Sequence, residues 1–215
     1  AASDTVTITA LFNEAMTATP TISITGVVNN EAMLGGTVSW TATDIATDMD
    51  EAQSVYSADL DGDGDMDIIS ASHLDDTIAW YENNNGDGSS WTITDISTAD
   101  MDGPYSVFAA DIDGDGDMDV IAASERDDDI SWFENTNGGN NWRKSVIART
   151  ADRPRSIFAA DMDGDGDMDI VSASSDDNTI AWYKNNNGNG SSWTAADIAT
   201  DKGGAFSVYA TDIDG

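Results

Sequence analysis

The chain has 215 residues and a formal net charge of −33, from 41 acidic residues against 8 basic ones. A surface this acidic argues against nucleic acid or an anionic membrane as a partner and favours bound cations. The absence of cysteine excludes disulfides and thiolate-bound metals, and no apolar run approaches the roughly 20 residues of a membrane-spanning helix. Seven Trp, five Tyr and five Phe provide material for a core, which argues against disorder.

The first 39 residues follow no repeat. Within them, residues 3–16 and 19–26 alternate Thr with apolar residues and are predicted strands. These strands resemble the trailing part of a bacterial Ig-like domain, but 39 residues are too few to close a sandwich. We therefore expect residues 1–39 to be either a linker or the remnant of an Ig-like β domain.

From residue 40 to residue 215, the chain repeats itself with a period of about 51 residues. One set of tryptophans recurs at a constant spacing of 51, and in a second set each Trp is followed by Tyr or Phe. The two sets contain all seven tryptophans: Trp40, Trp91, Trp142 and Trp193, and Trp80, Trp132 and Trp182. Such columns indicate a repeated structural unit rather than a biased composition.

The first complete repeat contains four segments with the features of short β-strands, at residues 54–60, 66–72, 77–83 and 91–98. They are rich in β-branched and aromatic residues and are separated by Asp/Gly and Asn/Gly loops, and no window shows a helical period. The same pattern places the strands of three repeats within residues 54–98, 106–149 and 156–200, and a truncated repeat begins at residue 207.

Four antiparallel strands per repeat predict an all-β fold, a β-propeller with four-stranded antiparallel blades of ~51 residues. Residues 40–215 would supply about three complete blades plus partial ones. Residues 40–47 match a fourth strand that lacks its first three, as expected where strands from opposite termini close a propeller. The aromatic columns are expected to pack between blades.

An acidic loop between the first and second strands carries the strongest signal. Residues 59–67 read DLDGDGDMD, with carboxylates at positions 1, 3, 5, 7 and 9, and close copies occupy residues 111–119 and 161–169. Ca²⁺ takes six to eight oxygen ligands in a tolerant geometry, whereas Mg²⁺ demands near-octahedral order and keeps its waters. The loops therefore predict calcium sites, and solvated Asp-Gly turns without metal are the alternative.

The loop shares only its first nine positions with an EF-hand. Gly64, at position 6, supplies the sharp turn, and Leu60 and Met66 are expected to point into the core. An EF-hand needs a bidentate Glu at position 12 and flanking helices. The residues at position 12 in the three copies are Ser70, Ala122 and Ser172. The flanks are strand-like, so an EF-hand is excluded.

The acidic loop and the segment IAWYENNNG at residues 78–86 resemble the FG-GAP/VCBS-type repeats of secreted bacterial proteins. Those repeats are related to the calcium-binding blades of integrin α-subunit propellers and of some fungal lectins. The resemblance covers residues 40–215 and implies a propeller, commonly seven-bladed, with Ca²⁺ in the loop between the first two strands of a blade. The Phe-Gly and Gly-Ala-Pro signatures behind the FG-GAP name are not evident, which favours the VCBS label.

The resemblance also implies a ligand set: the side chains at positions 1, 3, 5 and 9 and the main-chain carbonyl of position 7. In the three copies, these residues are Asp59, Asp61, Asp63, Asp65 and Asp67; Asp111, Asp113, Asp115, Asp117 and Asp119; and Asp161, Asp163, Asp165, Asp167 and Asp169. Asp212 and Asp214 begin a fourth copy, and the chain starts at Ala1 rather than Met. We therefore expect a fragment of a longer polypeptide that contains further blades.

The metal is expected to be structural, because the loops offer no obvious open position for a substrate. Extracellular calcium modules often have Kd values of about 10⁻⁴–10⁻³ M, so such loops would be filled outside the cell and largely empty in the cytoplasm. We therefore predict a secreted or cell-surface protein.

A ligand is expected to bind on the opposite face, where the turns between the second and third strands and the connections between repeats vary in sequence. The candidate ligand-binding residues there are His73, Tyr105, Arg126, Arg153, Arg155 and Phe206. The arginines either pair with neighbouring acids or contact an anionic glycan or a protein. His73, the only histidine, is expected to be a turn residue.

These features predict a calcium-stabilised binding or adhesion module whose partner is a glycan or an extracellular protein, without membrane insertion. One alternative is the scaffold of a polysaccharide-active enzyme such as a lyase, which needs a base and a charge neutraliser beside an acidic sugar. No Ser-His-Asp set or His metal cluster is visible, so we predict no catalytic residues and no enzyme. The other alternative is a purely structural repeat spacer.

Overall fold

The computed structural model of the chain describes residues 43–98, 100–201 and 203–213. Of the first 42 residues it describes four two-residue strands, β1 (Thr21–Ile22), β2 (Val27–Val28), β3 (Glu31–Ala32) and β4 (Val38–Ser39). The strand β1 pairs with β4 and β2 pairs with β3, in both cases antiparallel.

The chain divides into two compact units, Ala1–Thr47 and Asp48–Gly215. In the first unit, the strand predicted at residues 3–16 and most of the one at 19–26 lie outside the described residues. The interpretation of residues 1–39 as a linker or an Ig-like remnant stays a prediction.

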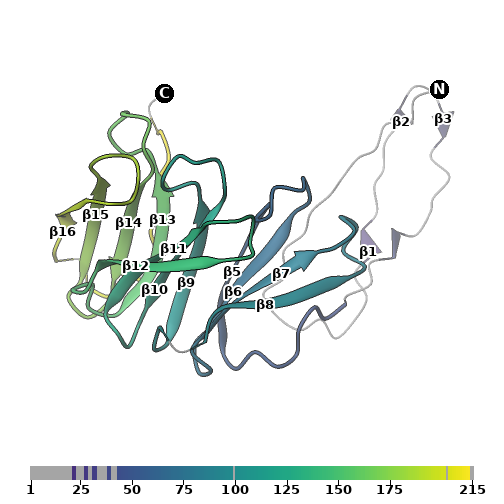
Figure 1. The fold of residues 1–215 in the computed structure, drawn as a ribbon, viewed down its shortest axis with the longest axis horizontal. Helices are drawn as coiled ribbons and strands as arrows, with labels where there is room; N and C mark the ends of the chain where they lie inside the picture. The colour runs from purple at the N-terminus through teal and green to yellow at the C-terminus, as the bar shows by residue number, and fades with distance from the viewer. Residues whose placement is uncertain are drawn as a thin grey trace. The chain divides into compact units, whose positions relative to one another are not determined.

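The second unit contains three four-stranded antiparallel sheets, in each of which consecutive strands pair (Figure 1). The first blade consists of β5 (Ala52–Ala58), β6 (Asp67–Ser72), β7 (Thr77–Asn83) and β8 (Trp91–Ser97). The second consists of β9 (Pro104–Ala110), β10 (Asp119–Ser124), β11 (Asp129–Asn135) and β12 (Trp142–Ala148). The third consists of β13 (Pro154–Ala160), β14 (Asp169–Ser174), β15 (Thr179–Asn185) and β16 (Trp193–Ala199).

This arrangement confirms the predicted all-β fold and its four-stranded, propeller-like blades. The sheets are separate rather than joined into one closed ring. Among the described residues there is no helix, and hence none with the length and apolarity to span a membrane.

Strand boundaries differ from the prediction at the acidic loops. The first strand, predicted at residues 54–60, is β5, which ends at Ala58. The chain leaves the sheet there because the N–H of Leu60 is donated to the Asp67 carboxylate, at 3.2 Å, instead of to a neighbouring strand.

At the two ends of the repeat region, the described residues of the predicted segments lack strand geometry. Residues 43–47, the described part of the strand predicted at 40–47, have no strand geometry because no described strand pairs with them. Residues 207–213, where a truncated repeat was expected, also form no strand. This segment nevertheless lies beside β13, since the N–H of Val208 donates to Ser156 Oγ at 3.2 Å.

The second strand of a blade is buried on both faces. Every residue of β10 is buried, and because side chains alternate along a strand, they divide between two cores. Val120 and Ala122 belong to a core shared with the first blade. Ile121 and Ala123 belong to a core shared with the third blade. The run of apolar residues at 120–123 in this strand follows from having a blade on each side.

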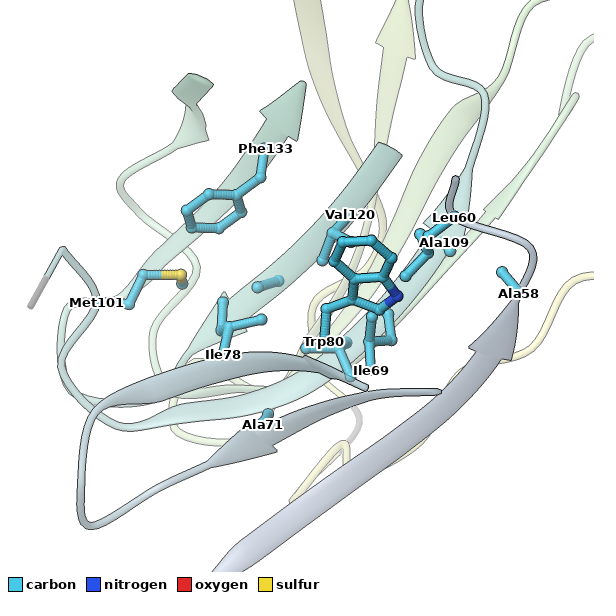
Figure 2. Packing of buried hydrophobic residues seen from close by; sticks show 12 residues of the cluster. Ala58, Leu60, Ile69, Ala71, Ile78, Trp80, Met101, Ala109, Val120 and Phe133 are labelled. Carbon is cyan, nitrogen blue, oxygen red and sulfur yellow. The ribbon is translucent and has the colours of Figure 1, made fainter. Parts of the chain in front are cut away.

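Each core lies between two blades, and a tryptophan of one blade packs against a glycine of the next. Figure 2 shows Trp80 in the first core, with Ile69, Ile78, Val120 and Phe133. A side chain on Gly139 of the second blade would collide with the Trp80 ring. Trp132 packs in the same way against Gly190 of the third blade. For these two tryptophans the predicted packing between blades is confirmed, and burying one such ring contributes roughly 4–6 kcal/mol of apolar transfer free energy.

The first strands of successive blades are joined by a repeated side-chain contact. Ser54 Oγ accepts the N–H of Val107, and Ser106 Oγ accepts the N–H of Ile157, both at 3.2 Å. One aromatic ring from each of these strands stacks on the next, with centroids 4.4 to 4.7 Å apart, in the order Tyr56, Phe108, Phe158 and Tyr209. These serines and aromatic residues recur at the spacing of the repeat and lie where successive blades meet.

We expect Gly190→Ala to destabilise the chain more than its matched control, Gly88→Ala. The two glycines hold the same place in their blades and both have positive φ, 64° and 71°, so a backbone cost of about 1–2 kcal/mol is common to both. Only at Gly190 would the new methyl group collide with Trp132; at Gly88 the nearest atom, of Trp91, is 3.7 Å away. The unfolding free energy from urea titration should fall by about 1–3 kcal/mol more for Gly190→Ala. Equal losses would contradict this packing.

Candidate metal centre

The first aspartate of each acidic loop closes the turn. Asp59 accepts the N–H of Gly62 on Oδ1 at 2.8 Å and the N–H of Gly64 on Oδ2 at 3.0 Å. Asp111 and Asp161 accept the equivalent pairs of glycine N–H groups at 2.7 to 3.1 Å. Gly62 and Gly64 have φ values of 77° and 96°, which explains why this turn uses glycine at both positions.

The aspartates at positions 3 and 5 fold back onto the same turn. Asp61 Oδ1 accepts the N–H of Asp63 at 3.2 Å, and Asp63 Oδ1 accepts the N–H of Asp65 at 2.9 Å. These local hydrogen bonds use one oxygen of each carboxylate and hold the side chains close together. Burial and the neighbouring carboxylates raise the pKa of Asp61 above its ordinary value.

The aspartate at position 9 is the buried member of the loop. Asp67, Asp119 and Asp169 are at most 1% exposed. The Asp119 carboxylate accepts the N–H of Asn135 at 2.8 Å and that of Ile112 at 3.1 Å, and the other two loops repeat both bonds. Burial raises the pKa of Asp119 to about 7 in spite of these donors. A cation near this position would therefore stabilise the folded loop.

The side chain at position 7 points away from the other carboxylates. A Cβ atom on Gly86 would overlap the Asp65 carboxylate, and one on Gly188 would overlap that of Asp167, so these side chains lie against the loop before the fourth strand. This placement agrees with the expectation that position 7 contributes no side-chain ligand. Leu60 is buried as predicted, but Met66 is 54% exposed, so the prediction that it enters the core is wrong. Met66 directly precedes β6, outside the strand whose side chains fill that core.

Three carboxylates in each loop converge to the spacing that a metal ion requires. In every group, one oxygen per residue lies within 4.8 Å of the others. Oxygens bound to one Ca²⁺ at 2.3–2.6 Å are at most about 5 Å apart. The groups are Asp59, Asp61 and Asp67; Asp111, Asp113 and Asp115; and Asp161, Asp163 and Asp165. Of the incomplete fourth copy, Asp212 is exposed and Asp214 lies outside the described residues.

An asparagine that sequence analysis treated only as the last residue of the third strand connects each acidic loop to its surroundings. Besides its N–H bond to Asp119, Asn135 donates its amide Nδ2 to Leu60 O of the preceding blade at 2.8 Å and to Met118 O at 3.1 Å. Asn185 repeats this with Ile112 O at 2.9 Å. Asn83, Asn135 and Asn185 follow the spacing of the acidic loops, and this column was the available sequence signal.

On the opposite face, the turns between second and third strands bond to the connections between blades. The N–H of Glu125 donates to Gly103 O at 2.9 Å, and the N–H of Ser175 donates to Arg153 O at 3.1 Å. Arg153 holds the place that glycines hold in the neighbouring connections and keeps a positive φ of 52°. The backbone strain at this position is a cost that a glycine would avoid.

The six predicted ligand-face residues form one cluster around Glu125, which sequence analysis missed. Glu125 Oε2 lies 2.9 Å from His73 Nε2, and Oε1 contacts Arg153 and lies 3.0 Å from Arg155 Nη2. Burial alone would raise the pKa of Glu125, but these cationic neighbours hold it below its ordinary value. The guanidinium of Arg155 lies 4.4 Å from the ring centroid of Tyr105.

The remaining members complete the cluster. Phe206 lies on the other side of Arg155, with its ring centroid 5.9 Å from the guanidinium carbon. Arg126 donates to His73 O at 3.4 Å and pairs with Asp102 at 3.1 Å. The arginines of this cluster thus pair with acids, which was one of the two interpretations open from the sequence.

Comparison with known families agrees with this geometry. A model of the FG-GAP-like repeat matches residues 59–122, 111–172 and 161–215, which together cover more than half of the chain. The chain belongs to the FG-GAP repeat family. In this FG-GAP repeat protein, each of the three matches to the family model begins at the first aspartate of an acidic loop. No curated protein matches the chain.

We expect Asn135→Ala to cost more stability than its matched control, Asn83→Ala. Each variant removes a buried amide from the same place in a blade. Within the part of the chain that the structure describes, however, Asn83 Nδ2 bonds only to Met66 O of its own blade, at 3.3 Å. Asn135→Ala additionally takes a hydrogen-bond donor from the Leu60 carbonyl. Chemical denaturation should show a further loss of about 1–3 kcal/mol for Asn135→Ala. A smaller loss than for Asn83→Ala would contradict the role of Asn135 between blades.

Proposed function

We propose that the chain is a calcium-stabilised binding or adhesion module of a secreted or cell-surface protein. One observation carries the proposal: in three successive blades, aspartate oxygens converge to within 4.8 Å of one another. Carboxylates at this distance repel, and a cation among them reverses the sign of the interaction. Calcium is the cation that suits an all-oxygen donor set on a turning backbone.

The donor sets fit calcium in their chemistry as well as in their spacing. Every group consists of carboxylates alone, without the nitrogen or sulfur ligands that zinc prefers. The side chains at positions 1, 3, 5 and 9 would hold the ion, which would supply structural charge neutralisation. Each loop also has local hydrogen bonds that orient part of its carboxylates before an ion binds.

The energetic effect of filled sites is comparable with the stability of a whole domain. A site held at ten times its Kd adds roughly 1.4 kcal/mol, so three independent sites add about 4 kcal/mol. Typical domains unfold with about 5–15 kcal/mol. Sites with the affinities usual for extracellular modules would need millimolar calcium, and FG-GAP repeats are typical of extracellular proteins. Both considerations support a location outside the cell.

The surface that would recognise a partner is the Glu125 cluster, on the face away from the metal loops. Arg126, Arg153 and Phe206 are its exposed parts: the arginine side chains are 39% and 42% exposed, and Phe206 is 63% exposed. The backbone of Arg153 has a positive φ, which strains a residue other than glycine, and strain of this kind concentrates at binding sites. The planar guanidinium groups of these two exposed arginines suit the carboxylate of an acidic glycan or protein.

A binding role is favoured over an enzymatic one by the surroundings of His73. Nδ1 lies 3.2 Å from Glu51 and Nε2 lies 2.9 Å from Glu125, so both ring nitrogens face carboxylates of the protein. A histidine held in this way is positioned as part of the cluster rather than as a base directed at a substrate.

Calcium should raise the melting temperature of the chain. With millimolar Ca²⁺ against excess EDTA, we expect a rise of about 10 °C by circular dichroism, from three sites of about 1.4 kcal/mol each. Replacing Asp61, Asp113 and Asp163 together by Ala should abolish most of the rise. The control replaces three exposed aspartates outside the loops, Asp48, Asp95 and Asp197, and should keep it. A melting temperature that is the same with Ca²⁺ and with EDTA would contradict a role for calcium in the proposed function.

Recognition of an anionic glycan is tested on an array that includes uronic-acid polysaccharides, in the presence of Ca²⁺. We expect binding that weakens at least about tenfold in Arg153→Ala and in Phe206→Ala, since these side chains form the exposed part of the cluster. Arg149→Ala removes one exposed positive charge outside the cluster and is the control. Equal weakening in the control would mean that net charge alone explains the effect. If no glycan on the array binds, a protein partner or a structural spacer is favoured.

A further inference from the structure

The three metal loops differ at one neighbouring position on the third strand of the blade. Directly before the asparagine that bonds to the buried aspartate, the first two blades have Glu82 and Glu134, whereas the third has Lys184. All three residues hold the same register against the fourth strand, where they pair with Thr92, Arg143 and Thr194. The third loop therefore has a positive charge where the other two have a negative one.

Lys184 reaches into the third loop. Its ammonium lies 2.8 Å from Asp165 Oδ2 and also contacts Asp163 Oδ2. These are the carboxylates at positions 5 and 3, and both belong to the group whose oxygens converge in this loop. The Lys184 side chain as a whole is 30% exposed.

The first two loops have no such internal cation among the described residues. There, glutamates occupy the place of Lys184: Glu82 adds a negative charge, whereas Glu134 pairs with Arg143 on the fourth strand. In the third loop the ammonium already balances part of the charge that calcium would balance. A bound Ca²⁺ would have to displace it or share the carboxylates with it.

We propose that Lys184 is a built-in counter-cation that makes the third loop a weak calcium site beside two stronger ones. The inference rests on the proposed function and deepens it by making the three sites unequal. Exchanging a negative for a positive side chain about 6–10 Å from a divalent ion weakens its binding by about 10- to 100-fold at the dielectric of water, the lower limit for such an interaction at a protein surface. The third loop stays ordered at calcium concentrations at which the first two have lost their ion.

The backbone amides of Gly64, Gly116 and Gly166 report each loop separately. Each donates to the first aspartate of its own loop, at 3.0 to 3.1 Å. In a calcium titration of the ¹⁵N-labelled chain, we expect Gly64 and Gly116 to shift together and Gly166 to shift at concentrations at least about tenfold higher. Isothermal titration calorimetry should then give two strong sites and one weak one.

Two exchanges test the assignment. Lys184→Glu should bring the Gly166 midpoint to that of the other loops, and Lys184→Gln, which adds no repulsion to the calcium-free fold, should shift it part of the way. The reciprocal variant Glu82→Lys should raise the calcium concentration at the midpoint of the Gly64 shift and leave the Gly116 and Gly166 midpoints unchanged. Arg149→Glu makes the same change in net charge as Lys184→Glu at an exposed position and should leave the order of the three amides unchanged.

The outcomes separate this inference from the proposed function. Three amides that shift over one calcium range in the parent chain, or a Gly166 midpoint unmoved in both Lys184 variants, would overturn the role of Lys184 while leaving calcium binding intact. If no glycine amide responds to calcium, both the inference and the proposed function are wrong.

Discussion

The structure depends on a carboxylate that is withdrawn from water at the end of each acidic loop. Asp67, Asp119 and Asp169 are almost completely buried, and each is held by one N–H group of its loop and one from the third strand of the blade. These bonds give a run of mutually repelling aspartates a defined turn. At Asp119 these bonds offset the burial of charge only in part, because burial raises the pKa of this carboxyl to about 7, and a nearby cation would favour its charged form.

The same loops are continuous with the contacts that join the blades. Asn135 bonds to the buried Asp119 of its own blade and to the Leu60 carbonyl in the loop of the preceding blade. Beneath this contact, Trp80 fills the core between those blades, and Ser54 connects their first strands. A cation that neutralised one loop would therefore stabilise two blades, because the loop forms part of the interface between them.

The sequence predicted the blades well because their signals are local. Alternation, aromatic columns and Asp/Gly turns define each strand without reference to distant residues. Glu125 was missed because its importance arises from His73 and Arg155, residues about 50 and 30 positions away along the chain. Met66 was misplaced because the strict alternation used for strands does not hold at the residue between loop and strand. The sequence shows that Lys184 aligns with Glu82 and Glu134 of the other repeats. Its contact with the third loop, however, is seen only in the folded structure.

The three kinds of contact that join successive blades all have the same polarity along the chain. The earlier blade supplies a tryptophan, a serine hydroxyl and a loop carbonyl. The later blade supplies the groups that meet them, respectively a glycine, a strand N–H and an asparagine amide. An interface with distinct front and back surfaces is head-to-tail, and any unit can follow any other that has the same two surfaces. Duplication or loss of one repeat of about 51 residues in the gene therefore creates no new kind of interface. The length of such an array can change in evolution while the chemistry that joins its units stays the same.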